Sequence, residues 1–247
     1  MADSDSSPTI QEDRGDYVQL LSLAAHELRT PVSVVGGYLR MLQRDVDTPL
    51  AARHKKMVDE AERSCARIVA LIAELSEVSK LDAGVAAVSV ERFDLFETLS
   101  TVAASVDEAK DRDVHLELRG PSEGAPMKGD LSRLRSAFTA VFRAVLREQP
   151  AACTVVGERR IEQRGGRTTA LTIVAEAGAV QRALDAPPAS FEEKRGGLGL
   201  LLPIARRVLE RHGGRIWSPA PPGPTSAILV ELPVDRNRTL SPSEPQP

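Results

Sequence analysis

Two stretches of the chain repeat apolar or small residues at alternating intervals of four and three. The first series consists of Leu21, Ala25, Leu28, Val32, Val35, Leu39 and Leu42. The second series consists of Met57, Ala61, Ser64, Ile68, Leu71, Leu75 and Val78. This spacing is typical of one side of an α-helix. It predicts a helix from about Gln11 to Asp45 and a second helix that ends around Leu81–Gly84, where glycine can stop it.

The two predicted helices are joined by a short turn near Asp47–Pro49, so they form an antiparallel hairpin. One hairpin cannot enclose its own apolar stripe, whereas two copies can. We therefore predict that residues 16–84 form an all-α helical hairpin that pairs into a homodimeric four-helix bundle. A generic coiled-coil hairpin without chemistry has the same apolar pattern. Residues 1–15, which precede the hairpin, are predicted to be a disordered tail.

From Val85 the pattern becomes a mixture of alternating and helix-periodic segments. The predicted strands are Val88–Phe93, Val114–Leu118, Cys153–Gln163, Arg167–Ala175, Arg215–Trp217 and Ser226–Leu232. The predicted helices are Leu95–Lys110, a helix capped by Asp130 that reaches about Arg147, and Leu198–His212. A loop is expected from Glu176 to Arg195. Together they predict an α+β two-layer sandwich over residues 85–234, followed by a disordered tail over residues 235–247.

The composition argues against several classes of partner. The 247 residues carry a net charge of −3 and show no basic run with interleaved aromatic residues, so nucleic acid is not an expected partner. Cys65 and Cys153 lie far apart without metal-ligand spacing, which is typical of a reducing cytoplasm and predicts no metal site. No window holds the roughly 20 apolar residues that cross a bilayer, so no membrane insertion is expected.

A candidate for chemistry stands in the first helix, away from its apolar side. His26 lies off the apolar series, and a neutral imidazole facing water can act as a nucleophile. Glu27 is adjacent and could orient the ring and take its proton, while Thr30 lies one turn along the same face. Pro31 has no backbone N–H and allows the helix to bend. Because position 30 is Thr, a zinc-protease His-Glu-x-x-His motif is excluded, but an ordinary solvated histidine remains the simplest alternative.

The segment His26-Glu-Leu-Arg-Thr-Pro31 resembles the H-box of the dimerisation and phosphotransfer domain of bacterial sensor histidine kinases. Farther on, Gly196, Gly197 and Gly199 precede a helix that is followed by His212-Gly-Gly. This order resembles the second glycine box of the ATP-binding domain of the same family, whose GHKL-type fold is shared with gyrase and Hsp90. The resemblance extends from about residue 15 to 234.

The resemblance implies a reaction and its participants. In the family the histidine, here His26, attacks the γ-phosphate of ATP and passes the phosphoryl group to an aspartate of a response regulator. Glu27 would orient and deprotonate the ring, and Thr30 would position water for dephosphorylation of the regulator. ATP and Mg are the cofactors that the family implies. Its nucleotide-binding residues would correspond here to Glu176, Gly178, Gly196, Gly197 and Gly199.

The sequence departs from the family where the nucleotide chemistry takes place. The family holds magnesium with two asparagines four residues apart on one helix, and this chain has Ala140 and Ala144 there. In the first glycine box Glu176 stands for an aspartate and Val180 for a glycine. Alanine offers no oxygen ligand, so the sequence predicts a nucleotide site that is weakened or lost.

The favoured interpretation is a cytoplasmic, dimeric transmitter protein that carries phosphate on His26 and binds the receiver domain of a response regulator. Phosphotransfer and phosphatase activity need the helical hairpin more than they need the ATP site. Two alternatives remain. One is a histidine phosphotransferase with a vestigial ATPase fold, and the other is a non-catalytic dimeric scaffold that sequesters a regulator.

Overall fold

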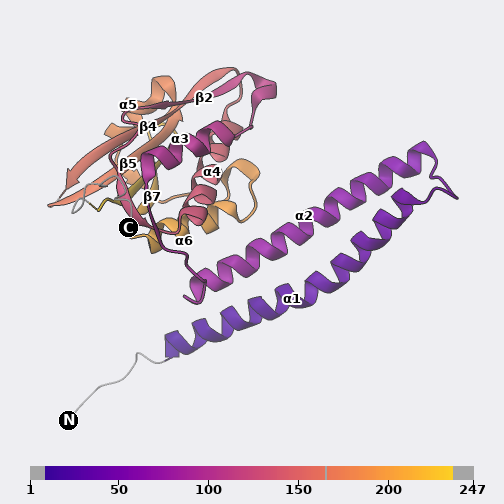
Figure 1. Ribbon diagram of the computed structural model, residues 1–247. Coiled ribbons are helices and arrows are strands. Elements are labelled where there is room, and N and C mark those ends of the chain that lie inside the picture. The colour runs from indigo at the N-terminus through magenta and orange to yellow at the C-terminus, as the bar shows by residue number, and fades with distance from the viewer. Residues whose placement is uncertain (1–8, 165, 236–247) are drawn as a thin grey trace, which may run out of the picture. The chain divides into compact units, whose positions relative to one another are not determined.

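The computed structural model describes residues 9–164 and 166–235, and its chain divides into two compact units. One unit extends to Ala86 and the other begins at Ala87 (Figure 1). Helix α1 begins at Thr9, so part of the tail predicted over residues 1–15 is helical. Residues 1–8 and the tail predicted after residue 235 lie outside the described residues. Within the described residues, no helix is long and apolar enough to cross a membrane.

The first unit is the predicted helical hairpin. It consists of α1 (Thr9–Arg44) and α2 (Ala52–Asp82), and α1 continues through Pro31. The turn between them is closed by Asp45, whose carboxylate accepts hydrogen bonds from the backbone N–H groups of Asp47 and Thr48 at 3.0 and 3.1 Å. A further bond from the Thr48 hydroxyl is the main reason why the pKa of Asp45 lies below its usual value.

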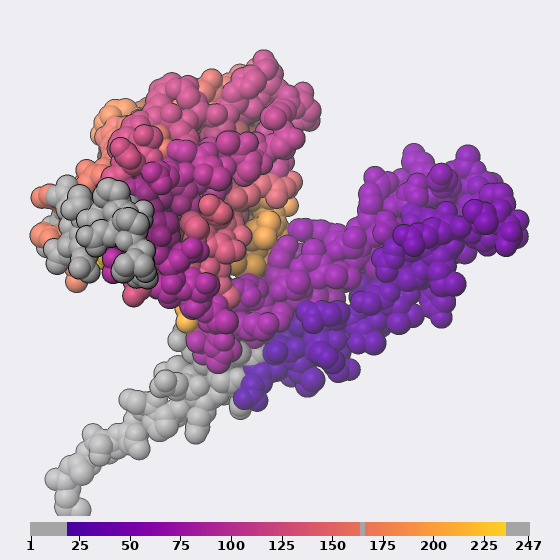
Figure 2. Space-filling model, viewed as in Figure 1, coloured from indigo at the N-terminus to yellow at the C-terminus, as the bar shows by residue number. Residues whose placement is uncertain are grey.

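Close contacts hold the two helices of the hairpin together. The Cys65 thiol donates to the carbonyl of Val32 at 3.1 Å, and a Cβ added to Gly36 would lie 3.1 Å from the same sulfur. The Gln43 amide donates to the Asp59 carboxylate at 2.9 Å. The small Gly36 allows the two helices to approach closely at the level of Cys65. Figure 2 shows the surface of this unit in indigo to violet.

Only part of the predicted apolar series is enclosed within the single hairpin. Ala25 is fully buried, whereas Leu28 and Val35 are 51% and 53% exposed, and Leu42 is exposed as well. Among the hairpin residues whose burial the structure describes, the other exposed large apolar side chains are Leu20, Leu23, Val34, Tyr38, Met41, Met57 and Ile68. Each hairpin thus presents an apolar stripe, defined here by Leu28, Val35 and Leu42, that α2 of the same chain does not cover.

The second unit is the predicted α+β sandwich. Its main sheet has the strand order β2-β4-β5-β8-β7-β6, in which β2 and β4 are parallel and the other neighbours are antiparallel. The strands are β2 (Val114–Arg119), β4 (Cys153–Arg164), β5 (Arg167–Glu176), β6 (Pro188–Ala189), β7 (Arg215–Pro219) and β8 (Ile228–Pro233). A separate antiparallel ribbon pairs β1 (Glu91–Asp94) with β3 (Pro126–Gly129).

Three longer helices form the second layer of the sandwich (Figure 1). They are α3 (Leu95–Ser105), α4 (Leu131–Glu148) and α6 (Leu201–Arg211). Asp130 caps α4 as predicted, because its carboxylate accepts from the Arg133 N–H at 3.0 Å. The aromatic side chains of α3 and α4, Phe96, Phe138 and Phe142, are fully buried in the core of this unit.

Several elements differ from the sequence-based expectation. The segment expected to be a loop after Glu176 contains the short helix α5 (Val180–Asp185) and strand β6, together with the 3-10 turns Ala177–Ala179 and Arg195–Gly197. Val180 and Ala183 are buried in an apolar cluster against the sheet, so packing rather than local periodicity orders this segment. Strand β3 was not predicted, since its four residues are too few to show alternation.

Candidate functional site

The candidate phosphoacceptor is displayed on the surface of α1. The His26 side chain is 74% exposed and that of Glu27 is 72% exposed, with Nδ1 of the ring 3.4 Å from Oε1 of the carboxylate. The preceding residue, Ala25, is fully buried and anchors this turn of the helix. With Nδ1 directed at the carboxylate, Nε2 is the ring nitrogen left for nucleophilic chemistry.

Thr30 completes this exposed group. It lies four residues after His26 and is exposed, which puts the two side chains on the same face of α1 one turn apart. Leu28 follows His26 by two residues, and two residues are separated by about 200° around a helix axis. The reactive face of α1 is therefore nearly opposite the exposed apolar stripe.

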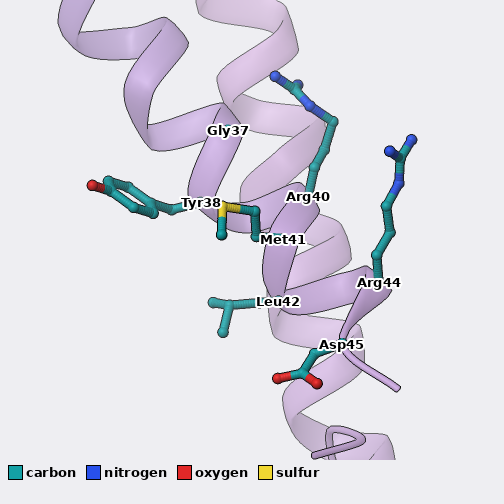
Figure 3. A pocket seen from close by; sticks show the side chains of 7 residues that line it. All are labelled: Gly37, Tyr38, Arg40, Met41, Leu42, Arg44 and Asp45. Carbon is teal, nitrogen blue, oxygen red and sulfur yellow. The ribbon is translucent and has the colours of Figure 1, made fainter. Parts of the chain in front are cut away.

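A shallow groove lies farther along α1, near the turn of the hairpin (Figure 3). Its lining combines the apolar side chains of Met41 and Leu42 with the ring of Tyr38, the guanidinium groups of Arg40 and Arg44, and Gly37 and Asp45. Leu42 belongs to the apolar stripe, so the groove is continuous with that exposed surface.

The three predicted glycines in the second unit form a turn just before α6. Gly196, Gly197 and Gly199 have φ values of +67°, +60° and +66°. Glycine adopts this left-handed backbone without strain, so these residues are required by the turn itself. The turn delays the start of α6 to Leu201, three residues later than predicted. Residues 196–199 are called the glycine turn below.

The glycine turn is bonded to the end of α4. A guanidinium nitrogen of Arg147 donates to the carbonyl oxygens of Gly196 and Gly197 at 3.4 and 3.3 Å. Glu108 accepts from Arg147 at 2.8 Å and from Arg143 at 2.7 Å. Burial of Glu108 favours its protonated form, but these two arginines outweigh burial and hold its pKa below the usual value.

Direct packing also joins the glycine turn to α4. A Cβ added to Gly196 would lie 3.0 Å from Cα of Ala144, which is itself fully buried. Ala140, one turn earlier on α4, is buried as well. The two positions that the resemblance aligns with the family's magnesium-binding asparagines are thus apolar and enclosed. They offer no oxygen ligand, and no group of three or more metal-ligating side chains stands together elsewhere in the described residues.

The remaining predicted nucleotide residues contact each other. The Glu176 carboxylate accepts from the Gly178 N–H at 3.0 Å and thereby caps the 3-10 turn that follows β5. Burial, reinforced by the negative charge of Glu176, raises the pKa of the neighbouring Cys153 thiol. Two separate sets of contacts therefore involve the predicted nucleotide residues. Glu176 bonds to Gly178 after β5, whereas Gly196 packs against Ala144 and bonds to Arg147 of α4.

Sequence reasoning missed the charged residues that surround the glycine turn. Arg147 and Glu108 were not singled out, nor was the ion pair between Arg195 and Glu148. One signal was available, because Arg143 and Arg147 are four residues apart and must share a face of α4. Their common partner, Glu108, comes from a different part of the sequence and could not be inferred from spacing.

Comparison with known proteins assigns the family of the hairpin and finds relatives that align over most of the chain. Residues 17–84 match the family model described as the His Kinase A (phospho-acceptor) domain. The chain is 24% identical over 217 residues to the alginate biosynthesis sensor protein KinB of Pseudomonas aeruginosa, covering 85% of this chain and 36% of KinB. The chain is related to the bacterial sensor histidine kinases. The resemblance to sensor histidine kinases that was inferred from the H-box is therefore confirmed.

Other sensor histidine kinases align over a similar part of this chain. The sensor histidine kinase MtrB of Mycolicibacterium paratuberculosis is 28% identical over 236 residues, which cover 89% of this chain and 40% of MtrB. The chain thus spans less than half the length of these two curated relatives. The match includes both units, whereas the family model covers the hairpin alone.

Solved histidine kinase structures share the fold. Full-length ShkA in complex with AMPPNP gives a TM-score of 0.65 at 21% identity, covering 87% of this chain and 46% of ShkA. Histidine kinase ThkA in complex with the response regulator protein TrrA gives a TM-score of 0.55 at 18% identity, covering 96% and 70%. The predicted fold class, a helical hairpin followed by a histidine kinase type α+β sandwich, is therefore confirmed.

Proposed function

We propose that this chain transfers phosphoryl groups in two-component signalling, with His26 as the phosphoacceptor. The observation that carries the proposal is the exposed imidazole on a His Kinase A domain, with its Nδ1 3.4 Å from the Glu27 carboxylate. A ring nitrogen that attacks phosphorus must reach a second protein, and a side chain 74% exposed meets that need. We assign residues 16–84 to the phosphotransfer domain and residues 85–234 to the ATPase-like domain.

The partner on this proposal is the receiver domain of a response regulator. The structure of ThkA with TrrA supports this class of partner, because ThkA shares the fold of this chain and TrrA is a response regulator protein. His26 would exchange its phosphoryl group with the receiver's aspartate, and Glu27 would hold the ring and accept the Nδ1 proton. The two free thiols, Cys65 and Cys153, suit a protein that acts in the reducing cytoplasm.

We further propose that the chain works as a homodimer joined along its apolar stripe. Exposed leucine and valine side chains in a continuous row are stabilised when a second copy covers them. A four-helix bundle made in this way encloses Leu28 and Val35 and leaves His26, nearly opposite on α1, accessible to a receiver domain.

A second candidate activity is dephosphorylation of the regulator. It is favoured by the exposed Thr30 hydroxyl, one turn from His26 and on the same face as the Glu27 carboxylate. A hydroxyl at this point can hold a water molecule in line with the receiver's aspartyl phosphate, and no bond to His26 is then needed.

Phosphotransfer is tested with receiver domains of the host genome, each charged with labelled acetyl phosphate. We expect at least one of them to label the chain, and the label must be lost in His26→Gln. His54→Gln is the matched control, because His54 is also an exposed histidine of the hairpin. Label that persists in His26→Gln would overturn the assignment of the phosphoacceptor.

Thr30→Ala separates the two candidate activities. We expect this variant to keep phosphotransfer to and from His26 and to release inorganic phosphate from the charged receiver at least about 10-fold more slowly. If the wild-type chain binds a charged receiver but neither takes nor releases its phosphate, the protein is a scaffold and both activities are wrong.

A further inference from the structure

Two kinds of contact hold the glycine turn against α4. Gly196 packs against the backbone of Ala144, with an added Cβ only 3.0 Å from the alanine Cα. In addition, Arg147 donates to the carbonyls of Gly196 and Gly197 and is itself held by Glu108. The left-handed φ of Gly196 means that no larger residue could take its place without strain.

A buried ion pair fixes the residue just before the glycine turn. Arg195 is 9% exposed and donates through Nε to Glu148, the last residue of α4, at 2.9 Å. It also donates to the carbonyl of Ala227 at 3.2 Å and to the hydroxyl of Ser218 at 3.3 Å. Arg195 thus links the glycine turn to α4, β7 and the start of β8. A buried guanidinium with these partners is costly to displace.

On the side that faces Arg147, the orientation of the turn opposes the binding of a nucleotide phosphate. Glycine-rich turns bind phosphate through backbone N–H groups that point at the anion. Here the carbonyl oxygens of Gly196 and Gly197 point at Arg147, and carbonyl oxygens repel phosphate oxygens. The guanidinium that could bind an anion already pairs with Glu108. A phosphate that approached the turn from the side of Arg147 would have to break these bonds.

The other groups that ATP and Mg would need are also engaged or missing. Ala140 and Ala144 are buried and carry no oxygen, so neither can hold the metal. The Glu176 carboxylate accepts from the Gly178 N–H and is committed to its own turn. The residues at this site therefore do not fit an ATP–magnesium complex.

We propose that the second unit is a nucleotide-independent module, and that the phosphoryl group on His26 is supplied by an aspartyl phosphate of a receiver domain rather than by ATP bound to this chain. This inference rests on the proposed role of His26. In the supplying reaction, Nε2 attacks the phosphorus, a P–N bond forms and the P–O bond to the aspartate breaks. The bonding electrons leave on the aspartate carboxylate, and the Nδ1 proton passes to Glu27.

Thermal unfolding of the full chain with ATP and Mg tests the nucleotide inference. A ligand present at about 100 times its dissociation constant would raise the Tm of a domain this size by at least about 5 °C. We expect millimolar ATP with Mg to move the Tm by less than about 1 °C and labelled ATP to leave no phosphate on the chain. A larger shift, or label from ATP on His26, would overturn the inference and leave the role of His26 intact.

A second experiment, with charged receiver domains, distinguishes failure of this inference from failure of the proposed function. The same protein is incubated with receiver domains charged by labelled acetyl phosphate, in the absence of ATP. Transfer of label from a receiver to His26, together with no label from ATP and no shift of the Tm with ATP, supports both proposals. If neither ATP nor any charged receiver leaves label on the chain, the proposed function itself is overturned.

Amide hydrogen exchange over residues 195–203 tests the closed turn directly. We expect slow exchange that ATP and Mg do not change, and exchange at least about 10-fold faster in Glu148→Gln, which weakens the hold on Arg195. Glu210→Gln is the matched control, because Glu210 is an exposed glutamate of α6 whose contact with Arg206 is 3.9 Å long. Equal exchange in wild type and Glu148→Gln would contradict the role given to this ion pair.

Discussion

The hairpin and the sandwich differ in how accessible their candidate functional residues are. In the hairpin, His26 and Glu27 are about three-quarters exposed, and the apolar stripe on the opposite side of α1 is not covered by α2. In the sandwich, Ala144 is fully buried, Arg147 donates to the glycine turn, and Arg195, the residue before the turn, is paired with Glu148. The candidate residues of the first unit face outward, whereas the polar groups around the glycine turn of the second unit bond to one another. Similarity to sensor histidine kinases therefore does not require both units to carry out the chemistry of those proteins.

The largest effect is expected from charging the apolar stripe. Leu28→Glu combined with Val35→Glu should raise the dissociation constant of the dimer at least about 100-fold, because four carboxylates would be buried without partners in the bundle. Analytical ultracentrifugation measures the change. Val46→Glu is the control, since Val46 is 86% exposed and lies beyond the end of α1. A double variant that stays dimeric would show that the stripe has another role.

In the sandwich, restoring an asparagine should damage the fold rather than rescue nucleotide binding. Ala144→Asn is expected to destabilise this unit by about 2–4 kcal/mol, because it inserts a polar side chain against Gly196. Urea unfolding followed by the fluorescence of the single tryptophan, Trp217, reports on this unit. Ala104→Asn, at an exposed position of α3, should cost only about 0.5–0.7 kcal/mol. A stable Ala144→Asn variant that binds ATP would refute the closed site.

Two neighbouring glycines of α1 sharpen the comparison within the hairpin. Gly36→Val should destabilise the hairpin by about 1–3 kcal/mol, because its Cβ meets the Cys65 sulfur at 3.1 Å. A Cβ on Gly37 meets no atom within 4 Å, so Gly37→Val should change stability by less than about 0.5 kcal/mol. Thermal unfolding followed by circular dichroism compares the two variants. Similar losses in both would mean that close approach of the helices does not limit stability here.

The smallest effect concerns the pH dependence of the sandwich. The pKa of Glu108 is lower in the folded chain than in the unfolded chain, so its contribution is fully present above about pH 4.3 and is lost as pH falls through the folded value. Glu108→Gln should reduce stability at pH 7 by no more than about 1 kcal/mol and flatten its decline at acidic pH. Urea midpoints measured from pH 7 to 3 provide the test. Parallel profiles in variant and wild type would exclude this ion-pair cluster as a source of acid sensitivity.

The sequence predicts the hairpin well because its information is local. Apolar residues at intervals of four and three specify both long helices, and His26 stands visibly outside that series. The same pattern does not say which members face α2, so the burial of Ala25 and the exposure of Leu28 emerge only from the packed hairpin. The catalytic roles of Glu27 and Thr30 remain predictions.

The sandwich shows where local information ends. From the sequence, Ala140 and Ala144 are predicted to replace oxygen ligands of the family. The contact of Gly196 with Ala144, by contrast, joins positions 52 residues apart and depends on how α6 packs against α4. Helix α5 was hidden for a similar reason, because six residues are too few to show a period and their burial against the sheet decides their structure.

Mapping the phosphoryl group is the most direct test of the central claim. The chain is incubated with a charged receiver domain without ATP and analysed by tandem mass spectrometry at neutral pH, which preserves phosphohistidine. We predict one phosphoryl group, on His26, and none on the chain's three other histidines, His54, His115 and His212. Phosphate on another of these residues, or a requirement for ATP before any phosphate is found, would contradict the account.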